Sequence, residues 1–234
     1  MQGLIGILGG MGPAATVDIF HKFVTFSTFA QRDQQHIPLL ISSIPDIPDR
    51  SHALLQNGIS PLNHLQRYFH LLEEAGAECI IIPCNTAHYW YDDLKRQARV
   101  EMISIIDSTI SEISLAGYRN VGLLATDATV AGGIYQTRLA EKGITLTMPS
   151  TNQQQAIMRS IYLFKAGNVG QAHQLMAEAA QHLLQQGVEA LICGCTEVPI
   201  ILAHEISRQP ERYIDATAAL VRAAINWYHH RMAA

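Results

Sequence analysis

Two cysteines of this sequence stand in similar phrases. Cys84 and Cys195 each follow an apolar run that reads as a strand, and Thr86 or Thr196 comes within two residues. In open α/β sheets, ligands bind at the carboxyl ends of the strands, where helices begin. Backbone N–H groups and a positive helix end lower the pKa of a thiol in such a loop. If two lobes face each other, one thiol could remove a proton from one face of a carbon while the other delivers a proton to the opposite face.

The other two cysteines, Cys79 and Cys193, fall inside the apolar runs, and we expect them to be buried packing residues. The cysteine spacings do not match the C-x2-C pairs of structural zinc sites, and no histidine pair completes such a site. The sequence therefore predicts no metal site.

The glycine-rich loop around Met11 is a further candidate for ligand binding. Gly10, Gly12 and Ala15 fit the relaxed G-x-G-x-x-A pattern of dinucleotide-binding loops. Pro13, however, removes one N–H donor, and no acidic residue ends the next apolar run to hold a ribose. We therefore favour a loop that holds a small carboxylate through backbone N–H groups, with Met11 among the substrate contacts, and we expect no cofactor.

Polar side chains beside the two cysteines each have two interpretations. Asn85, Thr86 and Thr196 could donate hydrogen bonds to a carboxylate or to an enolate-like charge, or they could cap helices. Glu197 either orients a neighbouring group or begins a helix, and we include it among the expected substrate contacts.

Three further residues have less distinctive surroundings. Arg50 and Lys165, each taken alone, read as surface charges. His88 lies four residues after Cys84, so a Cys–His couple remains open. On a helix, however, its ring is expected to point away from the strand end.

Short β-branched runs alternate with helical patterns along the whole chain, as is typical of α/β folds with parallel sheets. Most of these runs are apolar throughout, as expected for strands that are covered on both faces. One helix is bounded by Ser60 and Pro61 at its start and by Gly76 at its end. The predicted strands are residues 4–8, 39–43, 79–83, 102–106, 121–125, 144–148, 190–193 and 212–214.

A faint internal repeat organises these elements. Three phrases recur in the same order about 110 residues apart, namely residues 6–10 with 122–126, 80–86 with 190–196, and 105–109 with 213–217. We infer two pseudo-symmetric α/β lobes, each a mostly parallel sheet flanked by helices, with the active site in the cleft between them. The first lobe is predicted to comprise residues 1–107 and 208–234, with the final helix packed back on it, and the second residues 108–207.

The composition excludes several classes of protein. Hydrophobic residues make up 48% of the 234 residues, which excludes disorder, and a net charge of −4 without a basic cluster argues against nucleic-acid binding. No apolar run approaches the ~18 residues of a membrane helix, and the N-terminus does not read as a signal peptide. We expect a cytoplasmic protein with reduced thiols and no membrane partner. Charged residues are only 15%, against roughly 25% on average, which suggests a homo-oligomer.

Taken together, these loops resemble those of the aspartate/glutamate racemase family, and most of all its aspartate racemases. The matching phrases span the whole chain: residues 5–13 with Thr16, residues 48–50, 83–88, 165–167 and 194–197. The resemblance implies a two-domain α/β fold, a homodimer, and racemisation of small acidic amino acids without a cofactor. It assigns Cys84 and Cys195 as the acid/base pair.

By the same likeness, the α-carboxylate and amino end of the substrate would be bound by Asn85, Thr86 and Thr196, and its side-chain carboxylate by Arg50 and Lys165. Some relatives replace one cysteine and prefer one enantiomer, but this chain keeps both. Its first loop, Gly9 to Pro13, lacks the Asp-Ser phrasing of glutamate racemases, which favours aspartate without excluding glutamate.

The hypothesis is therefore an isomerase that interconverts L- and D-aspartate by proton transfer between two cysteines. A lyase or decarboxylase on the same scaffold would form the same carbanion, but such relatives commonly need only one cysteine. A non-catalytic binding protein for acidic amino acids would need no thiol. An oxidoreductase is the weakest alternative, because the glycine loop lacks the acidic partner that a nicotinamide cofactor requires.

Overall fold

A computed structural model describes residues 2–233 of the chain. They form two compact units: unit 1 comprises the residues up to Ser108 and those from Thr217, and unit 2 comprises Thr109–Ala216. Each unit holds a four-stranded sheet whose strand pairs are all parallel. This confirms the predicted α/β class with two parallel sheets flanked by helices.

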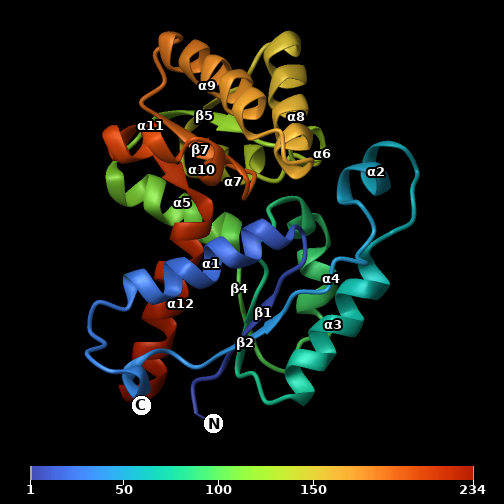
Figure 1. The fold of residues 1–234 in the computed structure, drawn as a ribbon, viewed down its shortest axis with the longest axis vertical. Helices are drawn as coiled ribbons and strands as arrows, with labels where there is room; N and C mark the ends of the chain where they lie inside the picture. Colours follow the sequence, from blue (N-terminus) through green and yellow to red (C-terminus); the bar gives the residue numbers. More distant parts are fainter. Residues whose placement is uncertain (1, 234) are drawn as a thin grey trace. The chain divides into compact units, whose positions relative to one another are not determined.

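Unit 1 has the strand order β2-β1-β3-β4. Figure 1 shows α1 and α12 together on one side of this sheet and α3 and α4 on the other. The elements of unit 1 are β1 (Ile5–Leu8), α1 (Pro13–Phe26), η1 (Asp33–Gln35), β2 (Leu39–Ser42), α2 (Arg50–Leu55), α3 (Leu62–Glu74), β3 (Cys79–Ile81), η2 (Thr86–Trp90), α4 (Tyr91–Lys95), β4 (Glu101–Ile103) and most of α12 (Ala216–Ala233), with α5 (Ile105–Ala116) continuing into unit 2.

The core of unit 1 forms because its inner strands are apolar on both faces. Ile7 of β1 lies opposite Ile41 of β2 and Ile81 of β3, and β1 and β3 are buried along their whole length. A β-carbon on Gly6 would lie 3.0 Å from the β-carbon of Ala77, so the absence of a side chain lets the segment after α3 approach the sheet. The parallel sheet is thereby covered on the α3 face.

Helix α12 belongs to unit 1 although it follows the last strand of unit 2. The Nε of Arg231 donates to Oε2 of Glu78 at 2.9 Å, and the guanidinium of Arg222 lies 5.4 Å from the centre of the Phe26 ring. α12 therefore packs beside α1 and the start of β3. Within residues 2–233, no helix combines the length and the apolar character that are needed to cross a membrane.

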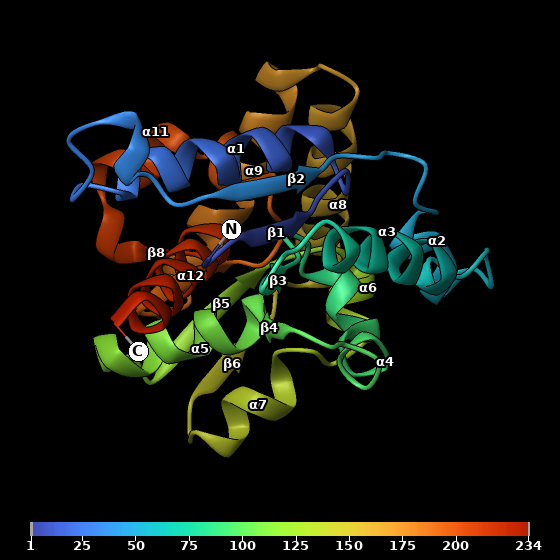
Figure 2. The same ribbon diagram turned by 90° about the horizontal axis from the view of Figure 1, so that it is seen from below.

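Unit 2 repeats the topology of unit 1, with the strand order β6-β5-β7-β8. Its elements are β5 (Asn120–Leu124), α6 (Asp127–Ala131), α7 (Gln136–Glu141), β6 (Thr145–Thr147), α8 (Thr151–Lys165), α9 (Val169–Gln185), β7 (Ala190–Cys193), α10 (Val198–Ile201), α11 (Ala203–Arg208), η3 (Pro210–Arg212) and β8 (Tyr213–Asp215). Helix α9 packs on β5 and β7, and α7 lies beside β6 (Figure 2). Gly122 in β5 stands where Gly6 stands in β1, and a β-carbon there would lie 2.6 Å from Leu191.

Two details differ from the expectation. Unit 2 extends to Ala216 rather than to residue 207, because β8 pairs with β7, with Asp215 opposite Cys193. The strand predicted at residues 102–106 ends at Ile103, because the Ser104 hydroxyl accepts a hydrogen bond from the N–H of Asp107 at 3.1 Å and so begins α5. Of the third pair of repeated segments, residues 105–109 therefore lie in a helix, α5, whereas residues 213–217 lie mainly in a strand, β8.

A buried carboxylate stabilises unit 1 on the α3 side. Glu73 of α3 has a side chain only 2% exposed; it accepts from the N–H of Arg99 at 2.7 Å and lies 2.9 Å from Nδ1 of His70. Burial raises its pKa, but the hydrogen bonds from His70 and Arg99 outweigh burial and hold the pKa below its ordinary value. The ionised form therefore contributes to folding.

Replacing Glu73 with glutamine is expected to lower the free energy of unfolding by about 2 kcal/mol near neutral pH. Because the carboxyl pKa is lower in the folded chain, its contribution is complete above the unfolded value of about 4.3. The contribution disappears as the pH falls through the folded value. Urea unfolding across this range should show the difference between wild type and Glu73→Gln shrinking in acid. Glu74→Gln, on the same helix but exposed, is the control; an equal effect of both changes would contradict the argument.

Candidate active site

Because all strands of unit 1 run in parallel, the loops that follow them lie at one edge of its sheet. The loop after β1 is held by the end of β2 and by α1: the N–H of Gly9 donates to Ser42 O at 2.8 Å, and that of Gly10 donates to Thr16 Oγ1 at 2.9 Å. Gly10 has φ +84°, and a β-carbon there would lie 2.4 Å from Ile44 O. These two amides bond to the protein itself, so the predicted carboxylate cradle is limited to the rest of the loop.

Cys84 lies at the same edge, in the loop after β3. Cys84 is 6% exposed and belongs to the same core cluster as Met11 and Ile47, so these three residues help form one core. Asn85 and Thr86 are also buried. Asn85 begins η2 without a hydrogen bond from its side chain to the helix, so N-capping is not its role.

His88 is placed differently from the expectation. Its ring is buried and turned back towards the strand end, with Nδ1 2.8 Å from the carbonyl oxygen of Cys84. This nitrogen bonds to the backbone of Cys84 and not to its sulfur, so His88 and Cys84 do not form the Cys–His couple of a nucleophilic enzyme. The reason is that η2 is a 3₁₀-helix that starts immediately after the loop.

Arg50 is the first residue of α2, which contacts η2, the 3₁₀-helix that follows the Cys84 loop. The side chain of Asp49 caps α2 by accepting from the N–H of His52 at 2.7 Å. The side chain of Arg50 is buried, and its Nη1 donates to Ile47 O and Pro48 O, both at 3.1 Å. No carboxylate of residues 2–233 forms an ion pair with it. A buried guanidinium without a counter-ion is suited to binding an anionic ligand.

In unit 2, Cys195 occupies the equivalent loop after β7. Its Sγ donates to Oε2 of Glu197 at 2.9 Å, and the Thr196 hydroxyl donates to the same oxygen at 3.3 Å. Nζ of Lys165, at the end of α8, lies 3.5 Å from the other oxygen of Glu197. The structure thus gathers Cys195, Thr196, Glu197 and Lys165 into one group. The side chain of Glu197 contacts these neighbours and does not cap α10, although Glu197 stands at the N-cap position of that helix.

Burial raises the pKa of the Cys195 thiol well above its ordinary value, and the charge of Glu197 raises it further, whereas the Lys165 ammonium lowers it. This corrects the expectation that the loop after β7 lowers the pKa of this thiol. The following helix, α10, is only four residues long, so its dipole is weak compared with burial and the adjacent carboxylate. Cys195 is therefore a thiol at neutral pH.

The sequence motifs did not reveal one polar loop, which follows β5 at the edge of the unit 2 sheet. Thr126 follows β5 as the glycine loop follows β1, and its hydroxyl caps α6 by accepting from the N–H of Thr129 at 3.2 Å. Gln154 of α8 donates to Ala125 O at 3.1 Å and holds this loop from the other side. The internal repeat contained the signal, because it aligns residues 122–126 with residues 6–10.

The remaining cysteines are packing residues, as predicted. Cys79 and Cys193 are fully buried in β3 and β7, and burial raises the pKa of Cys79 to about 12. All four cysteines are free thiols. Among residues 2–233, no group of three or more His, Cys, Asp or Glu side chains is arranged to hold a metal ion.

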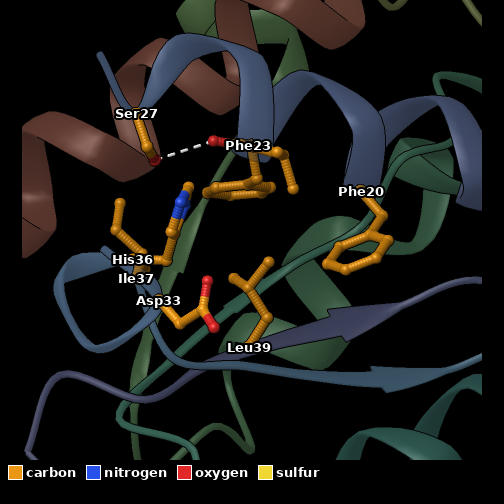
Figure 3. A pocket seen from close by; sticks show the side chains of 8 residues that line it. Phe20, Phe23, Ser27, Asp33, His36, Ile37 and Leu39 are labelled. Carbon is orange, nitrogen blue, oxygen red and sulfur yellow. Dashed lines mark hydrogen bonds between the residues drawn. The ribbon is translucent and has the colours of Figure 1, made fainter. Parts of the chain in front are cut away.

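A cavity of about 330 Å³ lies in unit 1 away from Cys84. Phe20, Phe23 and Leu39 face each other across it, with Asp33 and His36 beside them (Figure 3). It lies where α1 ends and β2 begins, which is the amino end of the parallel strands. The cavity is therefore separate from the loops that carry the candidate site.

The comparison with known proteins identifies a family. The family model of the Asp/Glu/hydantoin racemases matches residues 8–224. The chain belongs to this racemase family. Racemases are isomerases. Membership of this family confirms the resemblance that the sequence motifs indicated.

Within the family, the chain is 33% identical to the aspartate racemase of Picrophilus torridus, whose structure matches it with a TM-score of 0.88 over 97% of this chain and 94% of that chain. It is 27% identical to a broad specificity amino-acid racemase of Bacillus subtilis, over 96% of this chain and 98% of the relative. It is 31% identical to a glutamate racemase of Desulforudis audaxviator, over 70% of this chain and 60% of that protein.

Proposed function

We propose that the protein is a cofactor-independent racemase that interconverts L- and D-aspartate. The observation that carries the proposal is the matched placement of Cys84 and Cys195. Both are buried, free thiols in the loop after an inner strand, β3 in unit 1 and β7 in unit 2. Thiols serve as acid and base when one is ionised and the other is protonated.

In the proposed reaction, both cysteines act on one substrate α-carbon, from opposite faces. Cys84, as thiolate, takes the α-proton, and the carbanion then takes the thiol proton of Cys195. The product leaves Cys84 protonated and Cys195 ionised, which is the form that performs the reverse conversion. The hydrogen bond from Cys195 to Glu197 and the raised pKa of this thiol support its role as the proton donor of the resting protein.

The proposed substrate contacts combine two charges on helices α2 and α8 with donors of the two cysteine loops. Arg50 and Lys165 would hold the side-chain carboxylate, and the buried Arg50 without a protein counter-ion supports an acidic substrate. Asn85, Thr86 and Thr196 would bind the α-carboxylate and the amino end. Preorganised donors of this kind would also stabilise the charge that develops on the carboxylate as the α-proton leaves.

Aspartate is favoured over glutamate because the Picrophilus torridus aspartate racemase matches this chain with 33% identity and a TM-score of 0.88, and because the first loop, Gly9 to Pro13, lacks the Asp-Ser phrasing of glutamate racemases. We further propose that the protein is cytoplasmic and forms a homodimer. Its support is the low charged fraction of 15%, which is compatible with a surface partly covered by a second copy. Light scattering of the purified protein would test the dimer.

The first experiment is to incubate the reduced protein with L-aspartate in D2O and to follow Cα deuteration and optical rotation together. Both are expected to change without added cofactor, and iodoacetamide is expected to stop both. Deuteration without loss of rotation would contradict transfer between two bases. If neither changes with aspartate or glutamate, the racemase proposal fails. Release of CO2 from a disubstituted malonate would then indicate a decarboxylase.

A further inference from the structure

His88 joins the Cys84 loop to the beginning of α5 through both ring nitrogens. Nδ1 lies 2.8 Å from the carbonyl oxygen of Cys84, and the N–H of Ile105, the first residue of α5, donates to Nε2 at 3.0 Å. The ring stacks on Tyr91, with 5.1 Å between ring centres and 9° between planes. The Tyr91 hydroxyl donates to Met102 O in β4 at 3.0 Å. The ring therefore links the loops that follow β3 and β4.

The two contacts of the ring specify one chemical form. A backbone N–H can only donate, so Nε2 must accept from Ile105 and carries no proton. A carbonyl oxygen can only accept, so Nδ1 must carry the proton that it donates to Cys84. The doubly protonated ring would place an N–H against the N–H of Ile105. The neutral ring protonated at Nδ1 satisfies both partners, and no ring nitrogen is left to act as a base on the Cys84 thiol.

This arrangement holds the peptide groups on both sides of the Cys84 α-carbon. The N–H of Cys84 donates to Ile82 O at 2.8 Å, and its carbonyl accepts from His88. The backbone N–H of His88 also donates to Asn85 O at 2.9 Å, which closes the turn on itself. With both peptide groups held, the direction of the Cα–Cβ bond of Cys84 is set, and only the rotation about that bond remains to place Sγ.

We propose that His88 is the positioning residue of Cys84: it fixes where the thiol points by donating from Nδ1 to the Cys84 carbonyl, and the N–H of Ile105 on Nε2 holds the ring in the form that donates. The role rests on the proposed function of Cys84 as an acid/base residue. His88 itself exchanges no proton with the substrate. A displacement of about 1 Å at a reacting group can lower a rate by about 100-fold, so a loosened loop is expected to lower kcat.

Substituting asparagine or glutamine for His88 tests its two ring hydrogen bonds separately, because each amide side chain can retain only one of them. In His88→Asn, the amide nitrogen can occupy the place of Nδ1 and donate to Cys84. In His88→Gln, the amide oxygen can occupy the place of Nε2 and accept from Ile105. His88→Ala retains neither bond. We expect His88→Ala and His88→Gln to lower kcat by about 10- to 100-fold with little change in KM, and His88→Asn to recover most of the loss. His182→Gln, an exposed histidine on α9, is the control.

A second measurement does not depend on racemisation. The alkylation rate of Cys84 by iodoacetamide, followed on its own peptide by mass spectrometry well below the unfolding temperature, is expected to rise several-fold in His88→Ala and His88→Gln but not in His88→Asn. If the wild type does not racemise aspartate while this pattern holds, the proposed function fails and the positioning role stands.

The positioning role is overturned if His88→Ala keeps the wild-type kcat and alkylation rate, or if the asparagine and glutamine variants are equally impaired. If the variants do not fold, ¹H–¹⁵N correlation spectra of the wild-type ring decide. A proton on Nδ1 alone is expected, and a proton on Nε2 at neutral pH would overturn the proposal.

Discussion

Replacing either Cys84 or Cys195 with alanine is expected to abolish detectable racemisation of aspartate, with kcat reduced by about 10²- to 10⁴-fold. Each change removes the only proposed acid/base group on one face of the substrate. Cys195→Ala is expected to retain exchange of the α-proton with solvent in one enantiomer, because Cys84 can still remove and return a proton on its own face. Deuterium incorporation measured separately for L- and D-aspartate checks this expectation.

The control for the cysteine variants is Cys79→Ala, in the strand that leads to the Cys84 loop. Cys79 is fully buried and serves packing, so this change is expected to lower stability while each folded molecule keeps its activity. Normal racemisation by a Cys84→Ala, Cys195→Ala double variant would disprove the two-base mechanism. A loss of activity in Cys79→Ala equal to that in Cys84→Ala, at equal folded fraction, would remove the special role of Cys84.

Replacing Arg50 with methionine is expected to lower kcat/KM for aspartate by about 100-fold, mainly through KM. The guanidinium is buried and, among residues 2–233, bonds to Ile47 O and Pro48 O alone; its remaining donors would hold the substrate's side-chain carboxylate. Arg50→Lys keeps the charge but loses the planar, two-pronged geometry, so an intermediate loss is expected. Kinetics with aspartate and with asparagine, which lacks the side-chain charge, should show a much smaller effect for asparagine.

Arg67→Met is the matched control, because Arg67 is exposed on α3 and its guanidinium lies over the Tyr68 ring at 5.7 Å. Its kinetics should match the wild type. Equal losses for aspartate and asparagine in Arg50→Met would show that Arg50 supports the loop through Ile47 and Pro48 and does not recognise the substrate's charge.

Much of the fold could be predicted because its signals are local. Every predicted strand overlaps one of the strands β1 to β8, since apolar β-branched runs mark buried parallel strands. Ser60 accepts from the N–H of Leu62 at the start of α3, and Gly76 ends that helix with φ +93°. The error at residues 102–106 arose because an isoleucine pair reads equally well as strand or helix, and only the hydroxyl of Ser104 decides between them.

The sequence by itself determined the two cysteine loops, their place after matched strands and the family to which they belong. Only the tertiary structure decided what surrounds them. Cys195 is protonated because it is buried beside Glu197, and Glu197 in turn meets Lys165 from a different helix. His88 bonds to Ile105, which lies 17 residues further along the chain. A thiol's pKa and a ring's protonation depend on burial and on neighbours distant in sequence, and folding alone brings these neighbours together.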